Sequence, residues 1–488
     1  MIGYYTISII NLRMYKLRDI QVPAVQAGID FFEREKNTKL HRPSLIVCPT
    51  AWGKSILIAS IVNQINEKTI VLQPSRELLE QNVEKLKALG GDCSIFSAAM
   101  KQKEYGEITY ATLGSIKSLG HKFKELGYKH IIVDEADRFK RGKSHRDDTQ
   151  GMFKKFIEDS GIKSVLGVTA TPFKLQVCSN GMENYSVLKM LNIRGKSAAF
   201  YKDIIYVSQV QEMVSHEYWS KLLYEVYDVD TGRLMYNSTG ADYTDSSLKT
   251  FYEDQAIDTR IINRIRESDR KSILVFIPSV DNARDLVSKV PNSAAVWGDM
   301  PTDYRKFVIS EFRAGRIRVI FNVNVLSVGF DYPEIDMIIC GRPTASLGWM
   351  YQAYGRGTRI HPNKQDCLIV DFSGNTQKFG HIEDLYYKEL FGTWYLFGSG
   401  GIQLTGIDLR DIGHETEYSI TERELDKIRA SEAGNIKFTF GKHKDKLVKD
   451  CPHSYLQWIY NEFTAQKSWK SWNMSIKKEI ERVLKIKT

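Results

Sequence analysis

Three consecutive residues, Gly53-Lys54-Ser55, could bind phosphate. They follow the short apolar run Ser44–Cys48, which is typical of a strand, and precede a helical pattern that begins at Ile56. A strand, a tight turn and a helix N-terminus present backbone N–H groups and the positive end of the helix dipole to an anion. Lys54 would add a full positive charge, and the hydroxyl of Ser55 could ligate Mg²⁺.

The loop before these residues departs from the strict pattern G-x-x-x-x-G-K-[ST], because Cys48 stands where the first Gly belongs. Thr50 and Gly53 are the other loop residues that we expect to contact the phosphate-bearing ligand. A Gly-Lys-Ser alone arises by chance in many surface loops, so the prediction depends on the acidic residues that follow.

A pair of acidic residues, Asp134-Glu135, ends the apolar run His130–Asp134, about eighty residues after Lys54. The carboxyl ends of strands in α/β proteins form the edge where ligands bind. Asp134 would hold Mg²⁺, directly or through water, and Glu135 would polarise an attacking water. The alternative is a strand end capped by soluble acids, but the Gly-Lys-Ser upstream favours the chemical interpretation.

Two threonines, in the run Thr169-Ala170-Thr171, end another apolar segment just before Pro172. Their hydroxyls could hydrogen-bond the acidic pair and relay the state of a terminal phosphate. A polar turn between a strand and a loop explains the same fragment equally well, so both interpretations stay open.

A basic segment in the second half, MYQAYGRGTRI, places Gln352, Arg356 and Arg359 at helical spacing on one face. Two guanidiniums on a rigid element suit the negative charge that develops on a transferring phosphoryl group. A solvated basic helix face is the alternative, but Gly355 and Gly357 are poor residues for a surface helix.

The elements that must position these residues fall into two series of short apolar runs separated by helical patterns. In the first half the runs are Ser44–Cys48, Thr69–Gln73, Glu107–Ala111, His130–Asp134 and Ser164–Thr169, with a helix at Arg76–Leu89. In the second half they are Ser272–Ile277, Ser293–Val296, Arg318–Phe321, Ile335–Cys340 and Cys367–Asp371. Strands that alternate with helices predict an α/β fold with two tandem parallel-sheet domains.

Changes in pattern and composition divide the chain into four parts. We expect a first α/β domain at residues 1–195, a second at 196–376, an accessory connector at 377–433 and a small basic α+β domain at 434–488. The N-terminal segment MIGYYTISIINLRMYKLRD lacks the order of a secretory signal and is interpreted as a first strand.

The composition of the 488 residues, 42% hydrophobic and 26% charged, is that of a soluble globular protein without a membrane-spanning run. Six scattered cysteines, with no C-x-x-C and no matching His spacing, argue against zinc and against a disulfide framework. We therefore expect a reducing, cytoplasmic compartment. The net charge of +9 favours polyanion partners.

The segment 434–488 carries most of this charge, with eleven Lys and one Arg against two Asp and three Glu. Lys442, Lys444 and Lys446 alternate, which would put them on one face for contact with phosphates, and a solvated basic face is the alternative. Interleaved aromatics such as Tyr455 and Trp458 could stack on bases, or could form the core of a small domain.

Taken in order, these motifs resemble those of superfamily 2 helicases over roughly residues 12–375. The ordered set is Gln21 in KLRDIQ, Gly53-Lys54-Ser55, Ser75-Arg76-Glu77, Asp134-Glu135-Ala136-Asp137, Thr169-Ala170-Thr171, Gly329-Phe330-Asp331 and Gln352…Gly355-Arg356…Arg359. Within that superfamily the chain is most similar to RadD-like bacterial and phage DNA helicases, chiefly over residues 318–375. The resemblance implies two RecA-like domains that use ATP and Mg²⁺.

The resemblance also implies a role for each motif. Nucleotide contacts would come from Gln21 at the adenine edge, from the loop residues Thr50, Gly53, Lys54 and Ser55, and from Gly329 and Asp331 of the second domain. Metal binding and catalysis would use Ser55, Asp134, Glu135, Gln352, Arg356 and Arg359. The nucleic-acid backbone would be contacted by Arg76 and by Thr112 or Ser115 in ATLGSI.

Three features depart from the family pattern. Trp52 stands where the family has smaller residues, which predicts unusual packing or stacking. The tetrapeptide D-E-A-D suggests DEAD-box RNA helicases, but H-R-x-G-R is missing and T-A-T replaces S-A-T, so we favour DNA. RadD-like proteins often end in a cysteine-rich zinc module, whereas FTFGKHKDKLVKDCPHSYLQWIY is similar to the small C-terminal domain of exodeoxyribonuclease X-like enzymes.

The sequence therefore predicts an ATP-dependent helicase or translocase on single-stranded, forked or branched DNA, in the cytoplasm of a bacterium or of a phage-infected host. Repair, recombination and replication all stay open, and so do protein partners from these processes. The alternatives are a double-strand translocase that never separates strands, an RNA helicase, and a nucleic-acid-binding module with a non-hydrolysing nucleotide switch. No membrane or zinc partner is expected.

Overall fold

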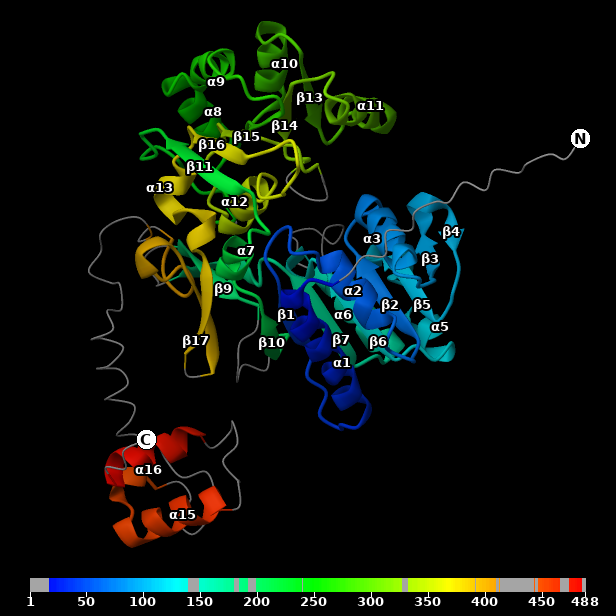
Figure 1. Cartoon of the computed structure of the whole chain (residues 1–488), viewed down its shortest axis with the longest axis vertical. Coiled ribbons are helices and arrows are strands. Elements are labelled where there is room, and N and C mark those ends of the chain that lie inside the picture. Colours follow the sequence, from blue (N-terminus) through cyan, green and yellow to red (C-terminus); the bar gives the residue numbers. More distant parts are fainter. Residues whose placement is uncertain are drawn as a thin grey trace, which may run out of the picture. The chain divides into compact units, whose positions relative to one another are not determined.

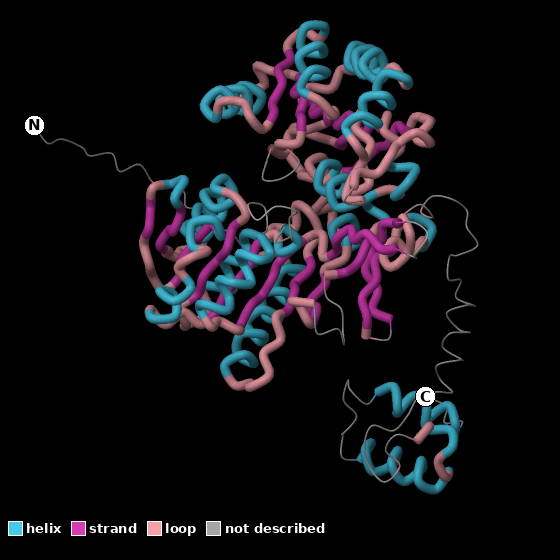
Figure 2. Tube along the Cα trace, turned by 180° about the vertical axis from the view of Figure 1, so that it is seen from behind, coloured by secondary structure: helices cyan, strands magenta, loops and turns pink. Residues whose placement is uncertain are grey.

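The computed structural model describes residues 17–138, 149–179, 184–191, 199–238, 240–326, 332–390, 392–409, 412, 443, 446–465 and 474–484. The chain divides into two compact units, Met1–His414 and Glu415–Thr488. The first unit contains two α/β sheets with their helices, seen in Figure 1 and in the tube of Figure 2, which we call the first and the second lobe.

In the described part of the chain, the first lobe is built on an eight-stranded sheet in the order β10-β1-β7-β6-β2-β5-β3-β4. Neighbouring strands are parallel except for β3 and β4. The strands are β1 (Ser44–Val47), β2 (Thr69–Gln73), β3 (Ser94–Ser97), β4 (Gln102–Lys103), β5 (Ile108–Thr112), β6 (His130–Asp134), β7 (Ser164–Thr169) and β10 (Asp203–Val207). The central strands β1, β2, β6 and β7 are buried along their whole length, as expected for parallel strands covered on both faces.

Helices pack around this sheet. They are α1 (Val22–Lys36), α2 (Lys54–Val62), α3 (Arg76–Ala88), α4 (Leu113–Ile116), α5 (Gly120–Glu125), α6 (Thr149–Ser160) and α7 (Val210–Ser215). Short 3₁₀ turns are η1 (Asp19–Gln21), η2 (Ala98–Met100) and η3 (Ala136–Arg138). α2 is buried at every position from Leu57 to Val62, which explains why this stretch is apolar except for Ser60.

The second lobe has a sheet in the order β11-β16-β15-β12-β14-β13, and its described neighbours are all parallel. The strands are β11 (Lys221–Val226), β12 (Ile273–Phe276), β13 (Ser293–Trp297), β14 (Val319–Val323), β15 (Met337–Cys340) and β16 (Asp366–Asp371). The helices are α8 (Asp245–Asp254), α9 (Ile257–Arg266), α10 (Val280–Lys289), α11 (Thr302–Arg313), α12 (Leu347–Tyr354) and α13 (Asn375–Phe379). The predicted α/β fold with two mostly parallel sheets is confirmed.

Two antiparallel hairpins complete the first unit. One pairs β8 (Phe173–Ser179) with β9 (Asn184–Met190), and the other pairs β17 (Tyr386–Leu390) with β18 (Thr393–Phe397). The second hairpin lies between the 3₁₀ turns η4 (Ile382–Asp384) and η5 (Ser399–Gly401). Its residues Tyr387 and Leu396 belong to the same hydrophobic cluster as the buried apolar residues of α2. The described part of the expected connector at 377–433 therefore contains a packed hairpin.

Every strand predicted between residues 44 and 371 is present, with its ends within two residues. The first strand expected in the N-terminal segment falls mainly on residues outside the described ranges. The first sheet also includes β10, which pairs with β1 and lies beyond residue 195, where the first predicted domain ends. Isolated sequence patterning did not indicate this edge strand, because residues 190–255 lack a regular alternation.

The second unit has its own small core. η6 (Val448–Asp450), α15 (His453–Ala465) and α16 (Met474–Leu484) are its described elements. The core residues are Val448, Cys451, Leu456, Ile459, Ile476 and Ile480. Tyr455 packs against this core, whereas the side chain of Trp458 is 55% exposed. The core interpretation therefore holds for Tyr455 but not for Trp458.

Among the described residues, no helix combines the length and the apolar composition that crossing a bilayer requires. The six cysteines are all unpaired, and four of them are buried.

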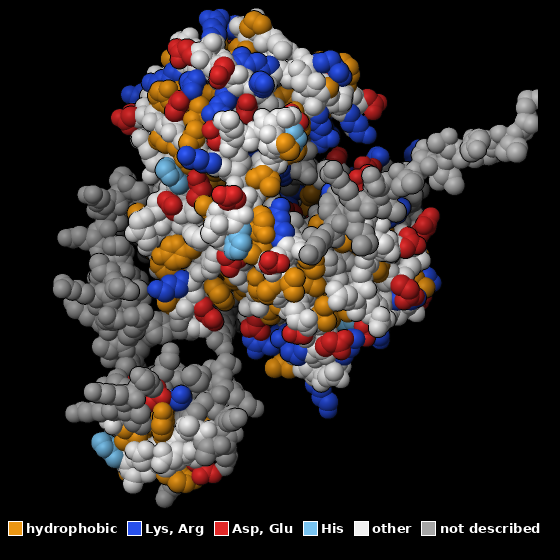
Figure 3. All heavy atoms as spheres, viewed as in Figure 1, with side chains coloured by type: hydrophobic (Ala, Val, Ile, Leu, Met, Phe, Trp, Pro, Cys, Tyr) orange, Lys and Arg blue, Asp and Glu red, His pale blue; other side chains and the backbone are white. Residues whose placement is uncertain are grey.

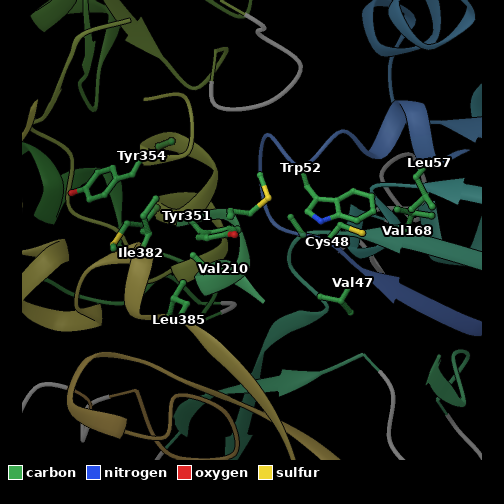
Figure 4. Close-up of a cluster of buried hydrophobic side chains, with 14 of the residues drawn as sticks. Val47, Cys48, Trp52, Leu57, Val168, Val210, Tyr351, Tyr354, Ile382 and Leu385 are labelled. Atoms are coloured by element: carbon green, nitrogen blue, oxygen red, sulfur yellow. The ribbon is translucent and has the colours of Figure 1, made fainter. Parts of the chain in front are cut away.

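Trp52 connects the loop after β1 to the largest hydrophobic cluster. Its side chain is fully buried, and Figure 4 shows it beside Cys48 and Val168. Its indole N–H donates to the hydroxyl oxygen of Ser208 (2.8 Å). Of the two expectations for Trp52, unusual packing or stacking, the structure therefore shows packing into the core.

Replacing Trp52 should test how much this packing contributes. We expect Trp52→Ala to lower the free energy of unfolding by about 3–5 kcal/mol, because it leaves a large cavity. Ser208→Ala, which keeps the indole ring but removes its hydrogen-bond acceptor and the donor to Glu212, should cost less, about 1–2 kcal/mol. Urea denaturation followed by circular dichroism measures both, with Trp458→Ala as the matched control. A Trp52→Ala cost no larger than that of the control would contradict the packing role.

Candidate active site

The carboxyl ends of three neighbouring strands bring the predicted motifs together. β7 lies between β1 and β6 in the sheet. The register pairs Val47 with Thr169 and Asp134 with Val168. The N–H of Cys48 donates to the carbonyl of Thr169 (3.0 Å), which ties the start of the next loop to β7. The segments after these strands therefore begin at one edge, where ligands of α/β proteins bind.

The turn after β1 depends on Gly53. Its φ of +100° lies in the region that side chains disfavour, and a Cβ there would lie 2.6 Å from Nε2 of Gln21. That amide donates to the carbonyl of Trp52 (2.8 Å), and its Oε1 accepts from the N–H of Arg18 (2.9 Å). α2 begins at Lys54, so a helix N-terminus follows the turn directly. Gln21, expected at an adenine edge, here holds the loop backbone.

Lys54 and Glu135 form an ion pair across this edge, with 2.8 Å between Nζ and Oε1. Burial disfavours the charge of Lys54, but the carboxylates of Glu135, Asp134 and Asp137 outweigh burial and raise its pKa. Burial also disfavours the charge of Glu135, yet the neighbouring Lys54 prevails and lowers its pKa. Both groups are therefore held in their charged forms.

Asp134 is the buried acid beside this pair. Its Oδ2 accepts from Nδ2 of Asn82 (2.8 Å), and its Oδ1 accepts from the N–H of Glu135 (2.9 Å). Burial, followed by repulsion from Glu135, raises the pKa of Asp134 to about 6. Sequence reasoning missed Asn82. The available signal was a polar residue on the apolar face of α3, between Leu79 and Val83.

The threonine run after β7 binds a different acid from the one expected. The hydroxyl of Thr169 donates to Oδ1 of Asp137 (2.7 Å) and accepts from the N–H of Thr171 (3.0 Å). The sequence suggested the pair Asp134-Glu135 as the partner of these hydroxyls, whereas Thr169 binds the third acid of that segment, Asp137. Asp137 lies in η3, one turn beyond the strand end, and this turn brings its carboxylate to β7.

The second lobe contributes Arg356 to this site. Its side chain is only 8% exposed, and its charge is among those that lower the pKa of Glu135. The prediction that Arg356 and Arg359 extend one helical face from Gln352 is wrong, because α12 ends at Tyr354. Glycine disfavours helix at the positions that follow, 355 and 357, so both arginines lie after the helix.

The end of α12 approaches the loop after β1 closely. A Cβ at Gly355 would lie 2.6 Å from Oγ1 of Thr50, so only glycine permits this approach. The N–H of Thr50 donates to the hydroxyl oxygen of Tyr351 (3.3 Å), and its carbonyl accepts from Nε1 of Trp219 (2.9 Å). Neither aromatic residue was singled out from the sequence, because each binds backbone and no motif records this.

The other second-lobe residues predicted for the site are only partly described by the structure. The guanidinium of Arg359 donates to the carbonyl of Gly355 (3.2 Å), beside the inter-lobe contact. Gln352 lies half-buried on α12. Gly329 and Asp331 lie outside the described residues.

The residues expected to contact nucleic acid gather at the next two strand ends. Gln73 of β2 pairs with Thr112 of β5, so the segments after both strands start side by side. The guanidinium of Arg76 bonds Glu80 (2.7 Å) and the carbonyl of Ala99 (3.1 Å). The hydroxyl of Ser115 bonds that of Thr112 (2.8 Å) and accepts from the N–H of Ala98 (2.9 Å).

The basic residues of the second unit are described only in part. Lys446 is exposed, whereas Lys442 and Lys444 lie outside the described residues. Tyr455 and the exposed Trp458 have ring centroids 5.8 Å apart on α15.

The donor set at the strand edge fits Mg²⁺ bound together with a nucleotide. Oε2 of Glu135 is buried and has no hydrogen-bond partner, so polar capacity is left at the site. Within the described ranges, no group of three or more His, Cys, Asp or Glu side chains could hold a metal by itself. Mg²⁺ in phosphate sites takes one or two protein ligands and completes its shell with water and substrate oxygens. Asp134 and Ser55 suit that requirement.

Comparison with known proteins gives matches in both lobes. The family model described as the type III restriction enzyme res subunit matches residues 14–174, and that of the helicase conserved C-terminal domain matches residues 256–361. IRC3 of Saccharomyces cerevisiae, described as an ATP-dependent helicase, is 25% identical over 379 residues, which are 73% of this chain and 51% of the yeast protein. This chain thus spans about half the length of that relative.

Two further similarities come from a phage protein and a solved structure. A 51.5 kDa protein of a Lactococcus phage is 22% identical over 369 residues, with 73% of this chain and 72% of the phage protein covered. The structure of the ATP-dependent type ISP restriction-modification enzyme LlaBIII bound to DNA aligns with a TM-score of 0.53 and 18% identity. That alignment covers 74% of this chain and 28% of the enzyme, and it supports the two-lobed fold.

The raised pKa of Asp134 gives a pH prediction. Below pH 6 the free protein should hold Asp134 protonated, so binding of ATP in the presence of Mg²⁺ should weaken by about tenfold from pH 7 to pH 5. The folded pKa exceeds the ordinary value, so protonation of this group stabilises the fold as the pH falls through 6, and unfolding does not cause the loss. A fluorescent ATP analogue measures the affinity.

Asp134→Asn is the control for this titration. It should bind the analogue with Mg²⁺ weakly and with little dependence on pH, because it has no proton to gain. Equal pH slopes for the wild type and the variant would show that another group controls binding.

Proposed function

The chain belongs to the superfamily 2 helicases, and we propose that this ATP-hydrolysing enzyme is a motor that moves along DNA or unwinds it. The observation that carries the proposal is the Lys54–Glu135 ion pair, whose acidic partner is also influenced by Arg356 of the second lobe. Charged groups from three distant segments thus meet at one edge, as the handling of a triphosphate requires.

ATP would bind with its phosphates at the N-terminus of α2. The backbone N–H groups of the turn at Gly53 and the charge of Lys54 suit the phosphate oxygens. An arriving phosphate competes with Glu135 for Lys54, so binding would release the carboxylate from its ion pair. Asp134 and Ser55 would hold Mg²⁺, which when bound neutralises charge on the phosphates.

The released Glu135 would act on the attacking water. Its carboxylate accepts a hydrogen bond from that water and orients the oxygen toward the γ-phosphorus. The bond from the water oxygen to the γ-phosphorus forms as the bond between the γ-phosphorus and the β–γ bridging oxygen breaks; ADP leaves with that electron pair, and the Glu135 carboxylate takes the proton that the water loses. Catalysis then rests on positioning and electrostatics, without a covalent enzyme intermediate.

The second lobe would complete the site. The charge of Arg356 lowers the pKa of Glu135, and Arg359 lies beside Gly355, which approaches Thr50 in the loop after β1 (residues 48–53), here called the phosphate loop. Their guanidiniums would stabilise the charge that develops on the transferring phosphoryl group. Gln352, Gly329 and Asp331 are proposed to contact the nucleotide or the water from the same lobe.

Nucleic acid would lie along the strand ends next to the nucleotide site. Arg76 and Ser115 bind the neighbouring residues Ala99 and Ala98, and Ser115 also bonds Thr112, so the three side chains are close together there, and all three can bind phosphate oxygens. Opening and closing of the lobes during each cycle of hydrolysis would then move the strand by one step. We favour DNA because the second lobe lacks H-R-x-G-R and the third motif is T-A-T. Repair, recombination or replication would be the setting.

The second unit would raise affinity through salt-sensitive contacts with phosphates. Figure 3 shows Lys and Arg side chains interspersed with Asp and Glu on the visible face of the second lobe. The segment 434–488, in contrast, has twelve basic residues against five acidic ones. Lys442, Lys444 and Lys446 are the proposed contacts.

An ATPase screen tests the motor proposal. Phosphate release should rise at least tenfold with single-stranded or forked DNA, and Lys54→Ala and Arg356→Ala should each lower it by about 10³-fold or more. Arg233→Ala, on an exposed arginine paired with Asp254, is the matched control and should leave turnover unchanged.

The choice of ligand separates the rival functions. Equal stimulation by blunt duplex without displacement of a forked strand would favour a double-strand translocase. Stimulation by RNA alone would reject DNA as the substrate. Phosphate release by the wild type no greater than that of Lys54→Ala on all ligands would leave only a nucleotide-binding switch.

Deletion of residues 434–488 tests the role of the second unit. We expect weaker binding of single-stranded DNA and unchanged basal hydrolysis. Loss of three phosphate contacts should make the slope of log affinity against log salt shallower by about 2. Fluorescence anisotropy across a salt series measures it, with Lys154→Ala/Lys155→Ala on α6 as the control. An unchanged slope would remove the assigned role.

A further inference from the structure

The hairpin β17–β18 touches the nucleotide site, although no sequence motif marks it. The hydroxyl of Tyr387, on β17, donates to the carbonyl of Ala170 (3.3 Å) in the threonine run after β7. Tyr387 is buried, and burial raises the pKa of its hydroxyl well above the ordinary value, so the group stays a neutral donor. The adjacent Thr169 binds Asp137, one of the acids that hold the charge of Lys54.

A glutamine fixes Tyr387 from the other side. Nε2 of Gln209 donates to the carbonyl of Tyr387 (2.8 Å), and Oε1 of Gln209 accepts from its N–H (2.9 Å). This two-point contact satisfies both backbone groups of one residue. Nε2 of Gln211 donates to the carbonyls of Glu383 and Leu385 (3.3 Å each), so the start of α7 is hydrogen-bonded to the backbone just before the hairpin.

The residue before this glutamine leads back to the phosphate loop. Ser208 accepts from the indole N–H of Trp52 (2.8 Å), and its own N–H donates to the carbonyl of Val47, the last residue of β1. The hydroxyl of Ser208 donates to Oε2 of Glu212 (2.5 Å), which also accepts from the N–H of Gln209 (3.2 Å). Hydrogen bonds therefore run from the phosphate loop through residues 208–209 to the hairpin.

Apolar packing follows the same route. Leu385 and Ile382, next to the hairpin, share one hydrophobic cluster with Val210, Trp52 and Val168. Figure 4 shows Leu385 and Ile382 close to Val210, with Trp52 and Val168 farther along the same cluster. A close-packed cluster of this kind transmits displacement, because it has little free volume.

We propose that Tyr387 is a positioning residue for ATP hydrolysis, and that the hairpin β17–β18 couples the phosphate loop to the threonine run after β7. The inference rests on the proposed motor function. Tyr387 would contact neither ATP nor the attacking water. It would act through the backbone of Ala170, which holds Thr169 against Asp137 and thereby maintains the charge balance around Lys54 and Glu135.

The test removes one hydroxyl and keeps the ring. Tyr387→Phe should lower DNA-stimulated turnover by about three- to tenfold, because one buried hydrogen bond is lost. The KM for ATP should stay within twofold, since the phosphate loop itself is intact. Tyr386→Phe is the matched control, because Tyr386 is the preceding residue on the same hairpin and its ring stacks on that of Phe397, with 5.2 Å between the ring centroids. It should not change turnover.

A purely structural role gives a different result. It would lower the melting temperature of Tyr387→Phe and reduce the active fraction, so that basal and stimulated turnover fall together. The inference is overturned by a parallel fall of basal and stimulated turnover. It is also overturned if turnover of Tyr387→Phe stays within twofold of the wild type, or if Tyr386→Phe shows an equal loss. If the wild type shows no DNA-stimulated hydrolysis at all, the motor proposal fails first and this inference fails with it.

A double-mutant cycle tests whether Gln209 acts through Tyr387. Gln209→Ala should lower stimulated turnover by a similar factor, because Tyr387 loses its support. Combining it with Tyr387→Phe should give a loss smaller than the product of the two single losses, since the hydroxyl is already absent. Multiplicative losses would show that the two residues act independently and would overturn the coupling route.

Discussion

The charge of Lys54, whose side chain is only 15% exposed, is the constraint on which the rest of the structure depends. An unpaired ammonium group at this depth would be strongly destabilising, so acids must meet it at short range. Glu135 provides the direct partner at 2.8 Å, and Asp134 and Asp137 add to the field. These acids lie far from Lys54 in the chain. Only a sheet that places β7 between β1 and β6, with their carboxyl ends aligned, can bring them together.

The parts that local sequence encodes were predictable. Buried parallel strands need short continuous apolar runs, and the runs ending at Val47, Asp134 and Thr169 have that composition. The turn at Gly53 was predictable because a helix start after this residue follows from residue identity and position. The acids were found because they end a strand, and strand ends of this kind share one edge. No knowledge of strand order was necessary for that inference.

The hydrogen-bond partners were not predictable, because they depend on register between distant elements. Asn82 reaches Asp134 only when α3 packs over the sheet, and Thr169 reaches Asp137 only through the turn η3. The helix containing Gln352 was expected to continue through Arg356, yet it ends before Gly355. That ending lets the backbone at Gly355 approach Thr50. The spacing of Gln352, Arg356 and Arg359, on which the expectation of a longer helix was based, contains no information about this contact.

Several contacts between distant parts of the first unit go to backbone atoms, and this explains why motif comparison does not reveal them. Tyr351 and Trp219 bind the N–H and the carbonyl of Thr50, and Tyr387 binds the carbonyl of Ala170. A backbone group is the same for every residue type, so the recognised positions carry no sequence signature. Single neutral hydrogen bonds contribute only about 1 kcal/mol each. Contacts of this size fix the loops in the observed arrangement of the lobes, and in the proposed cycle they are weak enough for nucleotide binding to break them.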